Sequence, residues 1–389
     1  MTICFFSAQY LPTVGGVERY THNLAQRVVA AGHQAIVVTS ALPGLPAREE
    51  QEGVTIFRLP AWLLMNGRFP IPHPGAAFSA LAAELWAMPI DFCLIQTRFY
   101  PLSLYAARQA KRRGIPAIVV DHSTGHMPMG RGPVAWAAHC YEHLACRFLR
   151  RQQVSFYGVS QAVCGWLKHF GLQPAGQLYN AVDPAQLEGI AFAPNAKDWR
   201  ATFGIGPQQP LVVFAGRIIP EKGVQELIEA FRTLELPDAV LAVAGDGPLL
   251  AQLRQNCPAQ VHLLGSLPYA ETLQLMAQAD LYCLPTRYAE GFPTTFLEAA
   301  ACGCPILTSR TGGSDELLPD ESYGIQLEQP TASAIRKALM QALAPDAVCW
   351  RTQAAEKTAQ RLRQHFTWEA VTQRLLEIAE DAQGVTFHE

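Results

Sequence analysis

The stretch "LYCLPTRYAEGFPTTFLEAAACGCPILTS" (residues 281–309) decides the fold. It starts with a short apolar run, passes through a turn that contains Gly291 and Pro293, and continues through an alanine-rich run into a second apolar run. This order predicts a strand, a turn, a helix and a second strand. Two strands joined through a helix lie parallel in one sheet, so the stretch indicates an α/β protein.

Two acids, Glu290 and Glu298, flank the Gly-Phe-Pro-Thr-Thr turn of this stretch. Thr295 and Glu298 have the spacing of a capping box, which would give Glu298 a structural role only. Glu290 precedes the turn, where no helix has begun, and has no such explanation. A helix that begins near Thr294 or Thr295 would direct its free N–H groups at the space between the two carboxylates. Anion-binding amides beside carboxylates that accept hydroxyl groups suit a phosphorylated sugar.

The same alternation of apolar runs and helical patterns extends through most of the chain, which predicts parallel sheets covered by helices. Strands are expected in the first half at 2–7, 34–40, 54–59, 92–96, 116–121 and 154–160, and in the second half at 211–216, 239–245, 261–265, 281–285 and 305–309. The fold class is therefore α/β, with two doubly wound, Rossmann-like domains. If they face a central cleft, the carboxyl ends of their strands border it.

The length of 389 residues also favours two domains, because a single core rarely grows this large. A polar stretch with several prolines and glycines, 180–210, interrupts the alternation and is typical of a linker. We therefore expect an N-terminal domain at 1–185 and a C-terminal domain at 186–365.

Charge is distributed unevenly between these halves. Residues 1–185 carry 15 Lys and Arg against 9 Asp and Glu, a net of +6, and residues 186–389 carry 15 against 24, a net of −9. The total of −3 gives no indication of a nucleic-acid partner. The halves are expected to face different partners.

The ten cysteines are scattered and form no Cys-x-x-Cys pair, which is typical of buried thiols in a reducing compartment. Cys302 and Cys304 are close in sequence, but no second pair with ligand spacing accompanies them. The first residues have no basic leader with a long apolar core, and no apolar run is long enough for a membrane span. A cytoplasmic protein is expected.

Arg217 and Lys222 follow the predicted strand at 211–216. They could be solvated loop cations, but the crevice at strand carboxyl ends favours an anion clamp. Gly15 and Gly16 precede a predicted helix and by themselves indicate only a tight turn. No Gly-x-Gly-x-x-Gly and no Walker sequence occurs, which disfavours an NAD-dependent oxidoreductase and a P-loop enzyme.

Histidines occur in two places that invite a functional interpretation. His122 and His126 follow the strand at 116–121, where each is either a polar cleft residue or a functional group. His139 and His143 share one helical stripe with basic residues, and either bind a metal as a pair or belong to a solvated basic face. No Asp-x-Asp occurs to hold a divalent ion on a diphosphate.

Taken together, these residues resemble the family-4 nucleotide-sugar glycosyltransferases of GT-B fold, the glycogen-synthase-like group. The resemblance covers essentially the whole chain and rests on "GGVERY", the strand end at His122, "FAGRIIPEKG", "VAGDGPL", "VHLLGSLP", "EGFPTTFLEAAACGCPI", "TGGSDEL" and "FTWEAVTQRLLEIA". One departure is Ala181, where the family often has a glycine after Asn180.

The resemblance implies a role for each matching position. Glu298 would hold the ribose hydroxyls of the donor, and Glu290 the hydroxyls of the transferred sugar. Arg217 and Lys222 would clamp the diphosphate, and His122 would contact the donor sugar, with His126 four residues away as the alternative. The implied donor-binding set is completed by Gly16, Gly245, Gly265, Gly291, Phe292, Pro293, Thr294 and Thr295.

The resemblance also implies a reaction and a division of labour. The activity would be a transfer with retention from a nucleoside-diphosphate sugar, without a metal or another cofactor, and with UDP favoured over GDP. Domain 186–365 would bind the donor, and domain 1–185 would bind a glycan or lipid-linked acceptor in polysaccharide or glycolipid assembly. A C-terminal helix at 366–389 would pack back on the first domain. Alternatives are a GT-B epimerase, a phosphorylase or an inactive nucleotide-sugar-binding protein.

Basic residues of the first half suggest an anionic membrane surface as a further partner. Two groups of cations, Lys111-Arg112-Arg113 and Arg147, Arg150 and Arg151, are close in sequence to the aromatic and apolar stretches 59–72 and 132–144. Such residues can hold a protein at the cytoplasmic membrane face without a span. The alternative is a solvated surface with the aromatic residues in the core.

Overall fold

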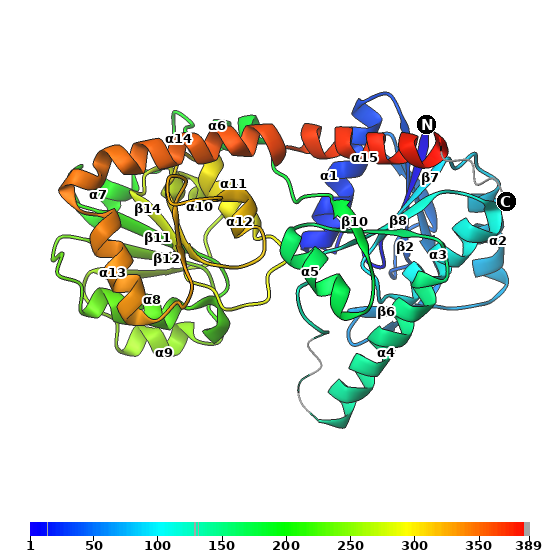
Figure 1. Ribbon diagram of the computed structural model, residues 1–389, viewed down its shortest axis with the longest axis horizontal. Coiled ribbons are helices and arrows are strands. Elements are labelled where there is room, and N and C mark those ends of the chain that lie inside the picture. The colour runs from blue at the N-terminus through cyan, green and yellow to red at the C-terminus, as the bar shows by residue number, and fades with distance from the viewer. Residues whose placement is uncertain (14, 128–129, 131, 385–389) are drawn as a thin grey trace. The chain divides into compact units, whose positions relative to one another are not determined.

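The computed structural model describes residues 1–13, 15–127, 130 and 132–384 (Figure 1). The chain forms two compact units, each of which is described by itself. Unit 1 comprises Met1–Asn180 and Trp368–Glu389, and unit 2 comprises Ala181–Thr367. Among the described residues, no helix combines the length and the apolar character that crossing a membrane requires.

Unit 1 is built on an eight-stranded sheet in the order β10-β9-β8-β7-β1-β2-β4-β3. Every pair is parallel except the edge pair β3 and β4. The strands are β1 (Thr2–Phe6), β2 (Gln34–Ser40), β3 (Arg48–Gln51), β4 (Val54–Leu59), β7 (Phe92–Gln96), β8 (Ala117–Asp121), β9 (Ser155–Gly158) and β10 (Pro174–Gln177). The central strands are apolar and buried along their whole length because helices cover both faces of the sheet.

The helices of unit 1 begin at different signals: two begin with a proline, and the side chain of Ser160 caps a third. They are α1 (Gly16–Ala30), α2 (Ala76–Trp86), α3 (Pro101–Arg113), α4 (Pro133–Arg150), α5 (Gln161–His169) and α15 (Trp368–Gly384). The last helix packs against α1: the rings of Tyr20 and Trp368 lie 5.6 Å apart, and Arg27 lies 2.8 Å from Glu369. Residues 385–389 of the helix expected at 366–389 lie outside the described residues.

Several strands of unit 1 were not anticipated from the sequence. β3 is the charged run Arg-Glu-Glu-Gln, and β5 (Ala61–Leu64) and β6 (Phe69–Pro72) form a separate antiparallel hairpin. β10 contains a proline and a glycine. These strands lack the continuous apolar run that indicates a central strand, because edge strands and hairpins bury only part of their surface.

Unit 2 is built on a six-stranded, all-parallel sheet in the order β13-β12-β11-β14-β15-β16. Its strands are β11 (Leu211–Ala215), β12 (Val240–Ala244), β13 (Val261–Gly265), β14 (Leu281–Leu284), β15 (Ile306–Ser309) and β16 (Ile325–Leu327). Its helices are α6 (Pro184–Ala191), α7 (Trp199–Phe203), α8 (Val224–Arg232), α9 (Leu250–Gln255), α10 (Tyr269–Ala277), α11 (Thr294–Ala301), α12 (Ser314–Leu317), α13 (Ala332–Ala342) and α14 (Val348–His365). Five of its strands are those predicted from the sequence.

The expectation of a linker at 180–210 was wrong. This segment contains α6 and α7, whose first turns are capped by the carboxylates of Asp183 and Asp198. Trp199 is fully buried and anchors α7 in the core of unit 2. Aspartate and proline are turn signals, but they are also favoured at helix starts, and burial of Trp199 decides between the two.

All ten cysteines are free thiols, but not all are buried. Cys349 is exposed, whereas Cys302 and Cys304 are buried in unit 2.

Candidate functional site

In unit 2, the loops after β11, β12 and β13 are joined by backbone hydrogen bonds. Gly216 N donates to Ala244 O at 3.0 Å, and Gly245 N donates to Gly265 O at 2.8 Å. Gly245 has φ 144°, and a Cβ there would lie 1.8 Å from Gly216 O. Only glycine fits such an approach, so "AGDG" fixes the loop that carries Arg217. The predicted residues Gly245 and Gly265 therefore support the site from within the loops.

A second glycine brings Lys222 to the loop after β14. Gly223 has φ 72°, and a Cβ there would lie 2.0 Å from Pro285 O. The adjacent loop is tied down because Arg287 N donates to Glu221 O at 2.6 Å. The close approach explains why the turn Pro220–Lys222 is followed by glycine.

Lys222 and Glu290 form an ion pair, with 12% and 14% of their side chains exposed. The ring of Tyr288 lies beside both predicted cations, 5.4 Å from Arg217 Cζ and 5.7 Å from Lys222 Nζ. Arg217 itself is exposed. The structure thus brings three of the predicted site residues together around Tyr288, which sequence reasoning missed because an aromatic loop residue carries no motif.

The helix α11 begins at Thr294 with Pro293 as its N-cap and without a side-chain cap hydrogen bond. The capping box was therefore wrong: Thr295 lies within the first turn, two positions after the N-cap residue. Glu298 is 8% exposed, and its Oε1 accepts a hydrogen bond from Tyr269 Oη at 3.1 Å. One oxygen of the Glu298 carboxylate thus binds a tyrosine of α10.

The turn between the two acids is held by the "TGG" segment. A Cβ at Gly312 would lie 2.2 Å from Glu290 O, and one at Gly313 would lie 2.1 Å from the Phe292 ring. Phe292 is buried and packs edge-on against Phe366, with ring centroids 5.3 Å apart. Gly291, Phe292 and Pro293 are all buried, so they shape the turn by packing.

In unit 1, His122 directly follows β8 at the carboxyl edge of the sheet. Its Nε2 lies 2.7 Å from Gln96 Oε1, and its ring contacts the Tyr20 ring edge-on at 4.9 Å. Burial lowers the pKa of His122 to about 4, against the opposing charge of Asp121. At neutral pH the imidazole is therefore uncharged and acts as a hydrogen-bonding group.

His122 lines a cavity of about 210 Å³. The other lining residues are Ser7, Ala8, Gln9, Val17, Glu18, Gln96, Thr97, Phe99, Tyr100, Asp121 and Ser123. Glu18 is a buried acid that the sequence reasoning did not single out, and burial raises its pKa. It lies in the first turn of α1, which begins at the predicted residue Gly16.

The loop that carries His122 is held by a buried ion network. Arg98 is fully buried and forms ion pairs with Asp121 and Glu142, which are also fully buried. Asp121 Oδ1 accepts from the backbone N–H of His122 at 2.8 Å, and Glu142 Oε1 accepts from Met127 N–H at 2.7 Å. Both ends of the loop are therefore fixed by carboxylates that one arginine holds in place.

His126 belongs to a different cluster. Its Nδ1 lies 3.3 Å from Glu142 Oε2, and its ring stacks on His139 at 3.9 Å. The rings of His143 and His169 lie 6.2 and 5.4 Å from it. Burial is the main cause that lowers the pKa of His126. Across the described ranges of the chain, no group of three or more His, Cys, Asp or Glu side chains is arranged to hold a metal ion.

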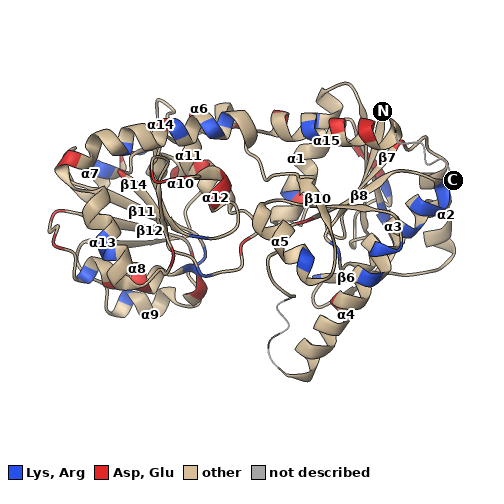
Figure 2. Cartoon of the chain, viewed as in Figure 1, with Lys and Arg blue, Asp and Glu red and all other residues tan. Residues whose placement is uncertain are grey.

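The two basic groups of unit 1 are adjacent in space, at the C-terminal ends of α3 and α4 (Figure 2). Lys111 Nζ donates to the carbonyl of Arg151 at 2.6 Å. On α4, Trp136 and Leu144 are 70% and 66% exposed. The aromatic residues of this region are therefore not all in the core.

Two family models match the chain. Glycosyltransferase Family 4 matches residues 14–186, and Glycosyl transferases group 1 matches residues 195–363. Together they cover most of both units.

Individual relatives agree with this division. The glycogen synthase of Mycobacterium tuberculosis is 27% identical, over 95% of this chain and 92% of its own. The GDP-mannose-dependent alpha-(1-6)-phosphatidylinositol monomannoside mannosyltransferase of Mycolicibacterium smegmatis is 26% identical, over 86% and 87%. The solved structure of Anabaena HepE in complex with UDP has a TM-score of 0.72 at 19% identity, covering 98% of this chain and 100% of that one. The chain belongs to the family-4 glycosyltransferases and has the GT-B fold.

Proposed function

We propose that this glycosyltransferase transfers a sugar from a nucleoside-diphosphate sugar with retention and without a metal, and that UDP is favoured over GDP. The observation that carries the proposal is the group on unit 2: Arg217 and Lys222 beside Tyr288, with Glu290 paired to Lys222. The group lies at the carboxyl ends of parallel strands, the edge where such sheets bind ligands.

In this proposal the cations of the unit 2 group stabilise the leaving diphosphate. When the bond between the anomeric carbon and the phosphate oxygen breaks, its electron pair stays on the diphosphate, whose negative charge grows. Arg217, Lys222 and the free amides at the start of α11 oppose that charge. The acceptor oxygen bonds to the anomeric carbon, and its proton leaves with the diphosphate.

The two acids would hold the two sugars of the donor. Glu298 would bind the ribose hydroxyls with the carboxylate that also accepts from Tyr269. Glu290 would bind hydroxyls of the transferred sugar, and its ion pair with Lys222 orients its carboxylate. His122 on unit 1 would offer the donor sugar a neutral hydrogen-bonding group.

The proposed acceptor is a glycan or a lipid-linked glycan, reached at an anionic membrane surface. One relative is named for its action on phosphatidylinositol monomannoside, which is a lipid. The adjacent cations at the ends of α3 and α4, together with exposed Trp136 and Leu144, support contact with such a surface.

Thermal unfolding with UDP, GDP and ADP in parallel tests the donor. A nucleotide at a hundredfold its dissociation constant adds about 2.7 kcal/mol to the free energy of unfolding, and UDP should give the largest shift. Proton NMR of the glycoside product then gives the anomeric configuration. A larger shift with GDP would overturn the base preference, and an inverted product would overturn retention. Nucleotide binding without any transfer would favour an inactive binding protein.

A further inference from the structure

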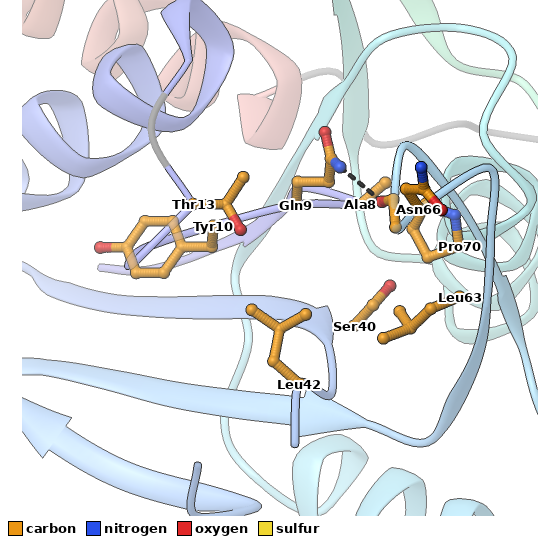
Figure 3. A pocket seen from close by; sticks show the side chains of 10 residues that line it. Ala8, Gln9, Tyr10, Thr13, Ser40, Leu42, Leu63, Asn66 and Pro70 are labelled. Atoms are coloured by element: carbon orange, nitrogen blue, oxygen red, sulfur yellow. Dashed lines mark hydrogen bonds between the residues drawn. The ribbon is translucent and has the colours of Figure 1, made fainter. Parts of the chain in front are cut away.

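Unit 1 has a second cavity, of about 330 Å³ (Figure 3). It shares two lining residues with the cavity that His122 lines. Its walls come from the loop after β1, the end of β2 and the β5–β6 hairpin. The lining residues are Ala8, Gln9, Tyr10, Thr13, Ser40, Leu42, Leu63, Asn66, Gly67 and Pro70. The proposed function assigns no ligand to this cavity.

None of these lining residues is charged. Within the part of the chain that the structure describes, the side chains of Thr13, Ser40 and Asn66 make no hydrogen bond to another residue, so their polar groups remain available. Leu42, Leu63 and Pro70 supply apolar surface. A sugar ring matches this combination, because its hydroxyl edges need hydrogen bonds and its C–H faces need apolar contact.

The hairpin wall of the cavity is held in place by its own sequence. Asn66, with φ 57°, and Gly67, with φ 82°, make the left-handed turn that asparagine and glycine tolerate best. Gln9 Nε2 donates to Gly67 O at 2.6 Å and ties this turn to the loop after β1 (Figure 3). The turn therefore has a defined position beside the cavity.

The two cavities of unit 1 share lining residues. Ala8 and Gln9 line both of them. A ligand longer than one sugar ring can therefore extend from the His122 cavity into the neutral one. A phosphate or carboxylate in the neutral cavity would find no charged lining residue to replace its hydration, which is costly.

We propose that the neutral cavity binds an uncharged sugar unit of the acceptor, next to the unit whose hydroxyl is glycosylated. The inference rests on the proposed function and narrows its acceptor. The acceptor then contains at least two sugar units, and the unit in the neutral cavity carries no phosphate or carboxylate. Any anionic group of a lipid-linked acceptor must lie elsewhere.

Saturation-transfer NMR and calorimetry on the full chain, saturated with UDP, test this inference. The probes are the neutral disaccharides maltose, cellobiose and α-1,6-mannobiose, the monosaccharides glucose and mannose, and the anions glucose 6-phosphate and glucuronic acid. We expect at least one neutral disaccharide to bind at least about fivefold more tightly than its monosaccharide, and the anions to bind more weakly than glucose.

Two pairs of variants locate the binding. Ser40→Ala and Asn66→Gly remove polar groups of the cavity, and each should weaken disaccharide binding about three- to tenfold. Thr39→Val and Met65→Gly change the adjacent positions outside the cavity and should leave binding unchanged. Glycine suits both turn positions because Met65 and Asn66 have φ 53° and 57°.

The outcomes separate this inference from the proposed function. Three results would overturn the sugar subsite alone, provided that UDP still binds. No neutral disaccharide binds, the anions bind as tightly as the neutral sugars, or Ser40→Ala and Asn66→Gly have no effect. If the unmodified protein does not bind UDP, the proposed donor itself is contradicted.

Discussion

Glu298 has two competing explanations: a structural role as part of a helix cap, and a functional role in binding the donor. Its capping role is excluded because α11 has no side-chain cap, and its carboxylate instead accepts from Tyr269 Oη. Only 8% of Glu298 is exposed. The proposed reason for an acid at this position is the ribose of the donor.

Replacing Glu298 by glutamine tests that reason. Glu298→Gln keeps an oxygen that can accept from Tyr269, so we expect the free energy of unfolding to change by about 1 kcal/mol or less. Donor affinity should fall at least about tenfold, because a charge-assisted hydrogen bond is lost. Calorimetry with the nucleotide and urea unfolding measure the two effects, with Tyr269→Phe as the control for the internal bond. Undiminished nucleotide affinity would leave Glu298 without a role in the donor site.

Of the two proposed diphosphate ligands, Arg217 gives the more easily interpreted test. Lys222 is paired with Glu290, so removing it also breaks an ion pair of that carboxylate. Arg217→Gln should lower turnover at least about 100-fold, since the charge it opposes is largest in the transition state. Affinity for uridine, which has no phosphate, should stay within about twofold. Steady-state kinetics and calorimetry check this, and a parallel fall in uridine affinity would mean that Arg217 supports the fold.

The depressed pKa of His122 has a consequence for stability. Its pKa is lowered by burial from 6.5 to about 4, so between these pH values the unfolded chain binds a proton that the folded chain does not. The free energy of unfolding therefore decreases as pH falls through this window. In His122→Gln this part of the decrease should be absent, which urea unfolding at several pH values measures. His33→Gln, in the turn after α1, is the control, and an equal pH slope in wild type and His122→Gln would contradict the prediction.

At the scale of elements, α3 and α4 bring together two cationic groups that are far apart in sequence. The link is the hydrogen bond from Lys111 Nζ to the carbonyl of Arg151, where both helices end. Cations at a helix C-terminus are favourable for the helix itself, so this basic end has a structural cause as well as a proposed functional one.

Removing the positive charges at the end of α4 tests whether this basic end binds a membrane or only stabilises its helix. The triple change of Arg147, Arg150 and Arg151 to serine should weaken sedimentation with anionic vesicles at least about tenfold, because each cation near the surface contributes about 1 kcal/mol. Binding by the unmodified protein should also weaken with salt. The matched control removes three exposed cations of unit 2, namely Arg232, Arg254 and Lys337. Equal weakening in both triple variants, or no binding to anionic vesicles at low salt, would contradict a docking role for these helix ends.

At the scale of the whole molecule, the reaction is expected to need no metal. The proposal relies on Arg217, Lys222 and the amides of α11 to oppose the charge of the leaving group. Turnover in excess EDTA should therefore stay within about twofold of the untreated rate. Loss of activity that manganese restores would show that the proposal is incomplete, whereas loss that no metal restores would indicate an effect of the chelator on the fold.

The sequence by itself determined the architecture of both units. Parallel strands buried on both faces are continuous apolar runs, so most of the central strands could be predicted to within one or two residues. The same periodicity placed Arg217 and His122 just after strand ends. The edge strands β3, β10 and β16, the β5–β6 hairpin and the two helices within 180–210 were missed, because their stability comes from partners distant in sequence.

Which side chains come into contact depends on the packing of the whole fold. No spacing in the sequence predicts that Tyr288 lies beside two cations, that Tyr269 bonds to Glu298, or that Arg98 joins Asp121 to Glu142. The lining of the neutral cavity could not be predicted from the sequence either, because Ser40 and Asn66 come from different elements. Local sequence sets secondary structure through propensity and burial pattern, whereas these contacts depend on how strands and helices far apart in the sequence are arranged around the sheets.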